Sequence, residues 1–242
     1  MNRRLNASIA SEFPSLTPLL RYVRNAALGL RSPKRVFTEV FRKNSWGESE
    51  SVSGPGSSPA QTEAVRRALP SLVQEMDCRS LLDIPCGDFS WMKLVEMEVE
   101  YLGGDIVDEL VTANQERHGD DSHRFVSLDL LRDELPRVDL VFCRDCLIHF
   151  SYRHIFRALN NIKRSGSTYL LTTTYVQRTE NGDIPTGGWR PINLELPPFN
   201  FPPPMRLIDE QCPHDDYRDK RLGLWELAAI PVLGEGVKGA PR

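Results

Sequence analysis

The sequence predicts an α/β protein built on a doubly wound, mostly parallel sheet of seven strands, with a helical extension at its N-terminus. Between residues 79 and 175, short apolar segments alternate with segments whose apolar residues recur at helical spacing. This alternation is typical of a parallel sheet with helices on both faces. Two β-rich segments near the C-terminus, Met205–Glu210 and Leu222–Ile230, predict an antiparallel pair at the edge of the sheet.

The composition is that of a globular protein with one domain of ordinary size. Its 242 residues are 40% hydrophobic and 26% charged, with a formal net charge of −3, which argues against a nucleic-acid partner. No stretch approaches the roughly 20 apolar residues of a membrane span. The five cysteines are odd in number, no secretory signal is evident, and two lie in strand-like segments. These features favour a reducing, cytoplasmic location.

Residues 1–44 are expected to form a basic, helical N-terminal extension, and residues 234–242 a flexible tail. The first 38 residues contain seven lysines and arginines and a single acid, Glu12. Three interpretations stay open: a surface helix with a frayed terminus, a basic arm that contacts a membrane surface or an acidic partner, and an organelle-targeting segment.

Residues 45–233 are expected to form the main domain, which begins with a loop rich in serine and glycine, residues 45–58, here called the cap loop. A helix follows, because Ser58 fits an N-cap, Pro59 the first helical position and Gln61 a capping box. The cap loop either covers a bound ligand or simply leads into this helix.

The other elements follow from apolar periodicity and from capping residues. Five apolar segments of strand length are found at 80–84, 99–105, 123–128, 138–143 and 169–175. Helices are expected between them over 89–97, 107–117 and 151–163. The last of these has Ser151 as its N-cap.

Residues 176–204, here called the insert, break the alternation. They contain seven prolines, each of which removes a backbone donor, so no long helix fits there. The aromatic residues of the insert argue against disorder, and a long loop in a compact domain is usually functional. We expect a wall or lid over a substrate, with a rigid surface loop as the alternative. The candidate binding groups, suited to polyhydroxyl or acidic ligands, are Trp189, Arg190 and Asn193.

Four aspartates stand at or just after the ends of predicted strands: Asp83, Asp105, Asp129 and Asp145. Ligands bind beyond the carboxyl ends of strands in an open α/β sheet, so these side chains are expected to converge on one crevice. Gly87 allows a sharp bend in the first turn, and the helix predicted after it would present free N–H groups to an anion. The turn lacks the G-x-G-x-x-G of dinucleotide sites, which argues against NAD and FAD.

Four motifs occur in order: D-I-P-C-G-D at 83–88, Y-L-G-G-D-I at 101–106, S-L-D-L-L-R-D-E-L-P at 127–136 and V-D-L-V-F-C-R-D-C-L-I-H-F at 138–150. Together they resemble the motifs of class I S-adenosylmethionine-dependent methyltransferases, from about Ser80 to Ile230. The first motif departs from the family's glycine-rich form, since Pro85 and Phe89 replace two glycines. The segments W-G-E-S-E-S-V-S-G-P-G-S-S at 46–58 and D-I-P-C-G-D-F-S-W at 83–91 also resemble a bacterial subgroup of these enzymes.

The resemblance implies S-adenosylmethionine as the cofactor. Asp105 would hold the ribose hydroxyls with Ile106 beside the adenine, and Asp129 and Leu130 would also lie at the adenine. The full set of cofactor residues that the resemblance implies is Asp83, Pro85, Cys86, Gly87, Asp88, Asp105, Ile106, Asp129, Leu130 and Arg144.

The resemblance also implies in-line transfer of a methyl group to an acceptor. We favour a hydroxyl of a small molecule or saccharide, because the net charge disfavours nucleic acid and the insert is polar with aromatic residues. His149 is the candidate general base, since its ordinary pKa near 6.5 suits proton uptake at neutral pH. Asp145, four residues earlier, would orient His149 or the acceptor. The alternative is that His149 merely packs at the start of the next helix.

No metal site is expected, because Cys143, Cys146 and His149 lack a fourth ligand at zinc spacing. Three other functions stay open. A catalytically degenerate S-adenosylmethionine-binding module that regulates a partner is favoured by the glycines missing at Pro85 and Phe89. A nucleotide-sugar or NAD-linked enzyme is disfavoured by the absent phosphate-binding motifs. A membrane-peripheral scaffold would use the basic N-terminus.

Overall fold

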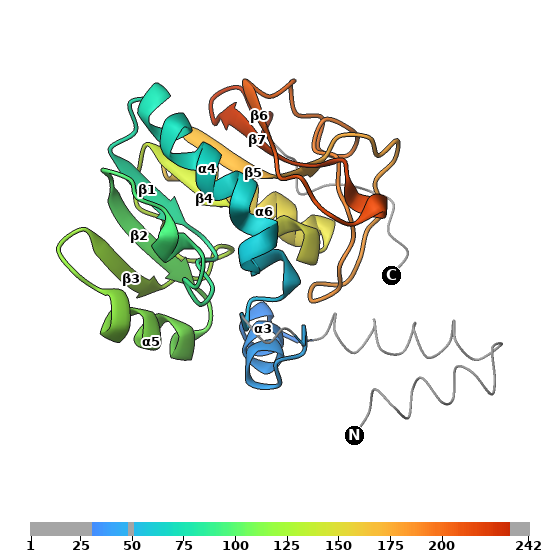
Figure 1. The fold of residues 1–242 in the computed structure, drawn as a ribbon. Helices are drawn as coiled ribbons and strands as arrows, with labels where there is room; N and C mark the ends of the chain where they lie inside the picture. The colour runs from blue at the N-terminus through green and yellow to red at the C-terminus, as the bar shows by residue number, and fades with distance from the viewer. Residues whose placement is uncertain (1–30, 48–50, 233–242) are drawn as a thin grey trace, which may run out of the picture.

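The computed structural model describes residues 31–47 and 51–232 (Figure 1). The predicted tail at 234–242 lies outside this range, and so does most of the predicted basic extension, for which membrane contact is one interpretation. Within the described part of that extension, α3 spans Pro33–Arg42 and is capped by the Ser32 hydroxyl. None of the helices in the described ranges is long and apolar enough to cross a membrane.

The centre of the fold is a seven-stranded sheet with the strand order β3-β2-β1-β4-β5-β7-β6. Strands β1 to β5 run parallel, whereas β7 is antiparallel to both β5 and β6. The mostly parallel sheet with an antiparallel closing pair is therefore confirmed. The strands are β1 Ser80–Asp83, β2 Glu100–Asp105, β3 His123–Ser127, β4 Leu140–Cys143, β5 Tyr169–Tyr175, β6 Arg206–Asp209 and β7 Lys220–Glu226.

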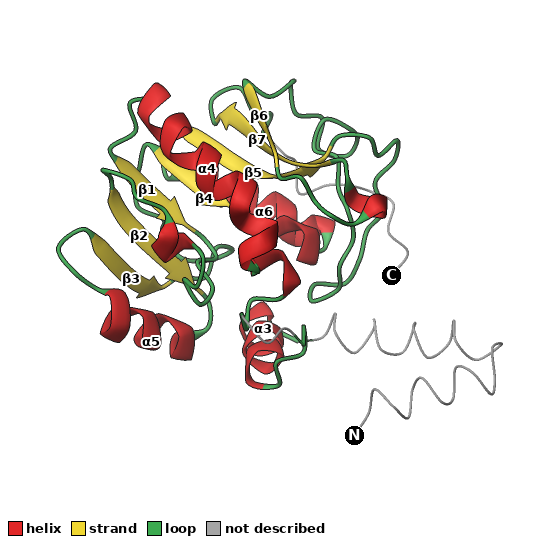
Figure 2. Ribbon diagram, in the orientation of Figure 1, coloured by secondary structure: helices red, strands yellow, loops and turns green. Residues whose placement is uncertain are grey.

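Helices cover both faces of the sheet (Figure 2). α4 (Pro59–Glu75) and α5 (Asp108–His118) pack on one face, and α6 (Tyr152–Arg164) packs on the other. The predicted N-caps Ser58 and Ser151 are confirmed, since each side chain accepts from the backbone N–H three residues ahead. The sheet is therefore doubly wound, as predicted.

Successive residues of the central strands enter two separate hydrophobic cores, because the side chains of a strand point alternately to opposite faces. On β4, Leu140 and Phe142 pack with α4 and α5, whereas Val141 and Cys143 pack with α6. All four side chains are fully buried. A strand covered on both faces therefore has a continuous apolar sequence instead of an alternating one.

The helix predicted over 89–97 does not form, and that prediction is wrong. Phe89, the first of these residues, has a positive φ of 56°, and Val95 is extended, with φ −101° and ψ 113°. A right-handed helix accommodates neither conformation. The chain makes only a 3₁₀ turn at Met92–Leu94. The aromatic ring of Phe89 instead packs edge-on against Phe125, with centroids 4.9 Å apart. There is consequently no helix N-terminus after β1 to receive an anion.

The insert contains no helix or strand, yet its side chains are packed into the protein. Phe199 and Phe201 are buried in the core on the α6 face. Trp225 of β7 donates from Nε1 to the carbonyl of Pro202 at 2.7 Å. The insert therefore forms a fixed layer over this end of the sheet.

We expect Gly223→Ala to destabilise the fold. A Cβ added at this position on β7 would come within 2.2 Å of the ring of Trp225, which lies on the same face of the strand. Because Trp225 is fully buried, the variant should lose about 1–3 kcal/mol of its free energy of unfolding, the usual cost of overpacking. Urea unfolding measures this loss. Gly182→Ala is the matched control, since nothing lies within 4 Å of its added Cβ; equal stability of the two variants would contradict the expectation.

Candidate active site

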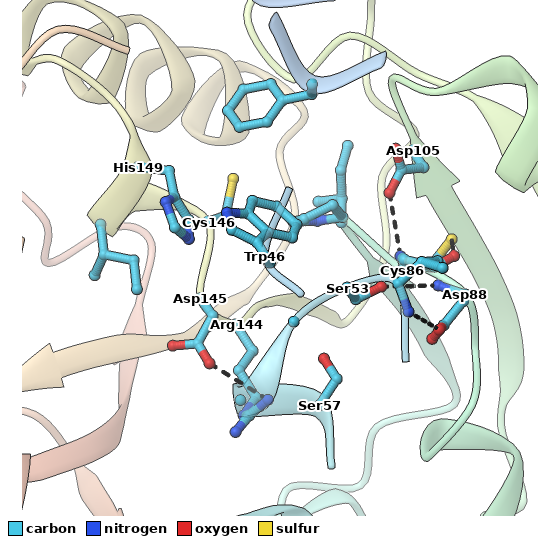
Figure 3. Close-up of a pocket in the computed structure, with 18 of the residues that line it drawn as sticks. Trp46, Ser53, Ser57, Cys86, Asp88, Asp105, Arg144, Asp145, Cys146 and His149 are labelled. Atoms are coloured by element: carbon cyan, nitrogen blue, oxygen red, sulfur yellow. Dashed lines mark hydrogen bonds and ion pairs between the residues drawn. The ribbon is translucent and has the colours of Figure 1, made fainter. Parts of the chain in front are cut away.

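A cavity of about 490 Å³ lies at the carboxyl ends of the parallel strands (Figure 3). This is where ligands bind in open α/β sheets, and the volume is in the range of small-molecule sites. The structure thus brings the four strand-end aspartates to one crevice. Most of the predicted site residues line it: Asp83, Pro85, Cys86, Gly87, Asp88, Asp105, Ile106, Asp129, Leu130, Arg144, Asp145, His149 and Trp189.

The turn after β1 is fixed against the end of β2 and against α5. The N–H of Gly87 donates to Oδ2 of Asp105 at 3.1 Å, and Nδ2 of Asn114 donates to the Gly87 carbonyl at 2.8 Å. Gly87 has a positive φ, and a Cβ there would lie 2.3 Å from the Ser53 hydroxyl. Only glycine fits at this point, where the turn, the cap loop and β2 meet.

Two buried carboxyl groups stand at the ends of the neighbouring strands β1 and β2. Burial raises the pKa of Asp83 to about 7, although the Tyr101 hydroxyl, which donates to Oδ2 at 2.6 Å, opposes the shift. Burial likewise raises the pKa of Asp105 to about 6, against the lowering effect of the N–H groups of Val107 and Gly87. Each Asp105 oxygen accepts one of these N–H groups and keeps a further lone pair for another donor.

The cap loop forms one wall of the cavity, which it lines with residues 52–57. It is fastened to the β1 turn through Asp88, whose Oδ2 accepts from the Ser51 hydroxyl at 2.8 Å and from the Val52 N–H at 2.9 Å. The Asp88 N–H in turn donates to the Ser53 hydroxyl at 3.1 Å. The loop lines the cavity and also leads into α4 at Pro59, so both interpretations of it stay open. Asp88, a predicted cofactor residue, uses its carboxylate to hold the loop.

Four charged side chains form a buried ion cluster at the base of the cavity: Arg144, Asp145, Glu210 and Lys220. Arg144 donates to Oε2 of Glu210 from Nε at 2.9 Å and from Nη2 at 2.6 Å. Nζ of Lys220 lies 2.7 Å from Oδ2 of Asp145 and 3.2 Å from Oε2 of Glu210. Two cations face two carboxylates, so the cluster is neutral, and pairing of this kind is what makes buried charges tolerable.

Asp145 is held by this cluster in an uncommon backbone conformation. Its φ is 52°, and its N–H donates to the Thr173 hydroxyl at 2.8 Å. Burial raises the pKa of Asp145, but the charges of Lys220 and Arg144 outweigh this effect and hold the pKa well below its ordinary value. Asp145 is therefore an anion at neutral pH and too weak a base to take a proton. The cap loop reaches it at Gly56, where a Cβ would lie 2.8 Å from Oδ2.

His149 has one ring nitrogen fixed by the main chain. Its Nδ1 lies 2.7 Å from the carbonyl of Gly188, so Nδ1 carries the proton and Nε2 has the lone pair. Burial lowers the pKa of His149 below its ordinary value, against the opposing effect of the Gly188 carbonyl. Trp46 of the cap loop covers the imidazole, with ring centroids 5.2 Å apart. His149 is thus a neutral, oriented imidazole, the state that a general base needs.

Of the three substrate residues predicted in the insert, only Trp189 lines the cavity. Asn193 is buried and bonds to main-chain atoms, donating to one carbonyl and accepting from one N–H. The structure therefore corrects the assignment of Arg190 and Asn193: their polar groups hold the insert in place. The buried guanidinium of Arg190 donates to the carbonyls of Gly182, Leu147 and Phe150.

Several cavity residues are not found by interpreting the sequence. Lys220, Trp46 and Tyr217 all line the cavity. Lys220 could have been noticed in the sequence, because it is the first residue of the apolar strand β7. A lysine buried in such a strand is rare without a charged partner. Trp46 begins the quoted segment at 46–58, and Tyr217 ends a 3₁₀ turn at Asp215–Tyr217. Neither position by itself indicates a place in the cavity, and the tertiary fold brings both residues there.

The described residues contain no group of three or more His, Cys, Asp or Glu side chains arranged to hold a metal ion. Cys143 and Cys146 are both buried free cysteines. Contact with Cys143, together with burial, raises the pKa of the Cys146 thiol well above its ordinary value.

We expect Asp83 to make the protein less stable as the pH rises from about 4 to 7. The native carboxyl group stays protonated up to a pKa of about 7, whereas the unfolded one loses its proton near 3.8. The native state therefore binds more protons in this window, and stability falls with pH by up to about 1.4 kcal/mol per unit. Asp83→Asn should remove this slope in urea unfolding measured at several pH values.

Asp139→Asn is the control of opposite sign. Hydrogen bonds from the N–H groups of Arg79 and Ser80 lower the pKa of Asp139. Asp139 therefore contributes stability above the unfolded pKa, and this contribution is lost as the pH falls. Identical pH profiles of stability for the wild type and both variants would contradict the pH dependence expected from Asp83 and Asp139.

No protein-family model matches the chain, and no curated protein matches it either. Solved structures align with part of it. Human N-acetylserotonin methyltransferase is 14% identical over 67% of this chain and 51% of its own, with a TM-score of 0.46. Magnesium protoporphyrin IX methyltransferase from Synechocystis is 16% identical over 63% and 81%, with a TM-score of 0.46. An amino pentose methyltransferase from Micromonospora echinaspora is 14% identical over 48% and 52%, with a TM-score of 0.40.

These three structures are methyltransferases with bound S-adenosylmethionine. The chain spans only about half to two-thirds of the length of several structures it aligns with. Its fold is defined by the strand order described above and not by these similarities.

Proposed function

We propose that this protein transfers the methyl group of S-adenosylmethionine to a hydroxyl of a small-molecule or saccharide acceptor. One observation carries the proposal: a single cavity contains both a buried carboxyl group at the end of β2, Asp105, and a neutral imidazole, His149, with its lone pair on Nε2. The carboxyl group suits a ribose diol, and the imidazole suits the proton of an acceptor hydroxyl.

The side of the cavity formed by β1 and β2 fits the cofactor. The remaining lone pairs of Asp105 suit the two ribose hydroxyls. Ile106, Leu128 and Leu130 line the same cavity with apolar surface for an adenine ring, and Asp129 stands beside them to accept from its exocyclic amine. The cofactor would supply a methyl group that is already strongly electrophilic, so the protein needs chiefly to position the acceptor.

On the acceptor side, His149 takes the hydroxyl proton at Nε2 while its Nδ1–H remains bonded to Gly188. Asp145, too weak a base for this step, accepts a hydrogen bond from the acceptor. Trp46 and the cap loop exclude water from the reaction space. Positioning of this kind lowers a barrier by up to about 7–11 kcal/mol, and a general base adds roughly 10²–10⁴-fold.

A second candidate function is an S-adenosylmethionine-binding module that regulates a partner without catalysis. The β1 turn favours it, because the N–H groups of Gly87 and Asp88 are bonded to Asp105 and Ser53. The methionine part of a bound cofactor would therefore be held less firmly in line with an acceptor, which affects methyl transfer more than binding.

We expect titration calorimetry of the full chain to show binding of S-adenosylmethionine, weakened at least tenfold in Asp105→Asn because a ribose acceptor is lost. The control is Asp121→Asn, an exposed change outside the cavity. Formation of S-adenosylhomocysteine is then measured against a panel of phenols and glycosides. Binding without turnover on any of them would favour the regulatory module, and absence of binding would refute both functions.

We expect His149→Ala to lower kcat by about 10²–10⁴-fold while the Kd of S-adenosylmethionine changes less than twofold. In the wild type, kcat should stay level through pH 7 and fall only below the lowered pKa of His149, since Nε2 is then protonated. The matched control is His123→Ala, a histidine on β3 outside the cavity. Equal losses of kcat and cofactor affinity in His149→Ala would remove this residue from the role of base.

A further inference from the structure

The insert joins Trp189 rigidly to His149. The N–H of Gly187 donates to the carbonyl of His149 at 2.9 Å, and Nδ1 of His149 donates to the carbonyl of Gly188 at 2.7 Å. The N–H of Arg190 donates to the carbonyl of Ile148 at 3.2 Å. The residues on both sides of Trp189 are therefore bonded to the turn that contains the base, so the indole and the imidazole keep a fixed relation.

The indole of Trp189 is supported by two tyrosine rings and is still partly exposed. It packs edge-on against Tyr217, with ring centroids 4.9 Å apart, and against Tyr175 at 6.4 Å. Arg178 lies over the Tyr217 ring at 5.8 Å and is paired with Asp219. Despite this support, Trp189 lines the cavity and remains 42% exposed. A large apolar ring fixed in this way presents a flat stacking surface.

The ion cluster sets the charge of the group that can bind beside this surface. Asp145 and Lys220 line the cavity and can hydrogen-bond to a ligand. Because Arg144 and Glu210 complete a neutral set, the base of the cavity offers donors and acceptors without net charge. A charged acceptor would gain no counter-ion there, and a flat apolar acceptor would leave the spare donor and acceptor sites of Lys220 and Asp145 unused.

We propose that Trp189 is the platform on which a neutral sugar ring stacks, with one hydroxyl at Nε2 of His149 and others on Asp145 and Lys220. A sugar ring has an apolar C–H face for the indole and hydroxyls that both donate and accept. This inference rests on the proposed function for the fate of the hydroxyl at His149. Binding of the sugar, however, depends only on Trp189 and the ion cluster, so it can be measured without cofactor.

The test is saturation-transfer NMR of the full chain without cofactor. The probes are the methyl glycosides of glucose, galactose, mannose, rhamnose and xylose, with glucuronic acid and catechol as the charged and flat alternatives. We expect at least one neutral glycoside to bind, with signal on the protons of one ring face. Trp189→Ala should weaken that binding about tenfold or more, and Trp189→Phe should restore part of it. Leu94→Ala, which removes an exposed apolar side chain outside the cavity, should have no effect.

Binding of catechol or glucuronic acid in place of every neutral glycoside would overturn the inference, and so would glycoside binding that survives Trp189→Ala. Absence of binding by all probes would overturn it as well. The thermal midpoint of each variant checks its fold, and Trp189→Phe decides the case if the alanine variant is unfolded. Cofactor calorimetry on the same samples separates the two proposals. Glycoside binding without cofactor binding would contradict the proposed methyl transfer but would still support Trp189 as the sugar-binding surface.

Discussion

The pairing of Arg144 with Glu210 is the interaction on which the candidate site depends. Arg144 follows β4 and Glu210 follows β6, so one buried ion pair ties the parallel part of the sheet to its antiparallel edge. Removing one partner of a buried pair typically costs 3–5 kcal/mol, because the other charge is left without compensation. Oε1 of Glu210 is buried with no hydrogen-bond partner within the described structure. The negative charge of Glu210 is therefore balanced only by Arg144 and Lys220, both of which lie at Oε2.

The same cluster explains the geometry around the cavity. Lys220 must lie within reach of both Asp145 and Glu210, which links the start of β7, across the end of β5, to the chain that follows β4. Asp145 is thereby held at a positive φ, and the chain after it turns into the segment that contains His149. The orientation of the candidate base is therefore set by two independent constraints, the ion cluster on one side and the insert on the other.

Much of the sheet could be predicted from the sequence, because apolar strands and capped helices have local signatures. Tyr169–Tyr175 is a strand over the same residues as predicted, and Ser58 and Ser151 cap their helices. The strand-end aspartates also follow from local pattern, since the ends of parallel strands meet at one edge. The helix expected over 89–97 fails where Phe89 takes a positive φ and its ring packs against Phe125 of β3, a tertiary contact that no local pattern records.

The parts of the site that could not be predicted are those created by contacts between distant segments. Arg190 has the composition of a ligand-binding residue, but its guanidinium is used by three carbonyls that only the folded chain brings together. Lys220 and Trp46 enter the cavity from segments separated by most of the chain length. No local pattern records such proximity, and a single sequence does not reveal it.

The cap loop encloses the cavity on one side but contributes no residue to the sheet or to the helices that cover it. Every strand and the helices on both faces come from residues after Ser58, so a chain that began at Pro59 would retain the whole sheet. It would lack Trp46, Ser53 and Gly56, and with them the wall that spans from the β1 turn to Asp145. In such a protein the cavity would be an open groove, in which solvent reaches both halves of the site.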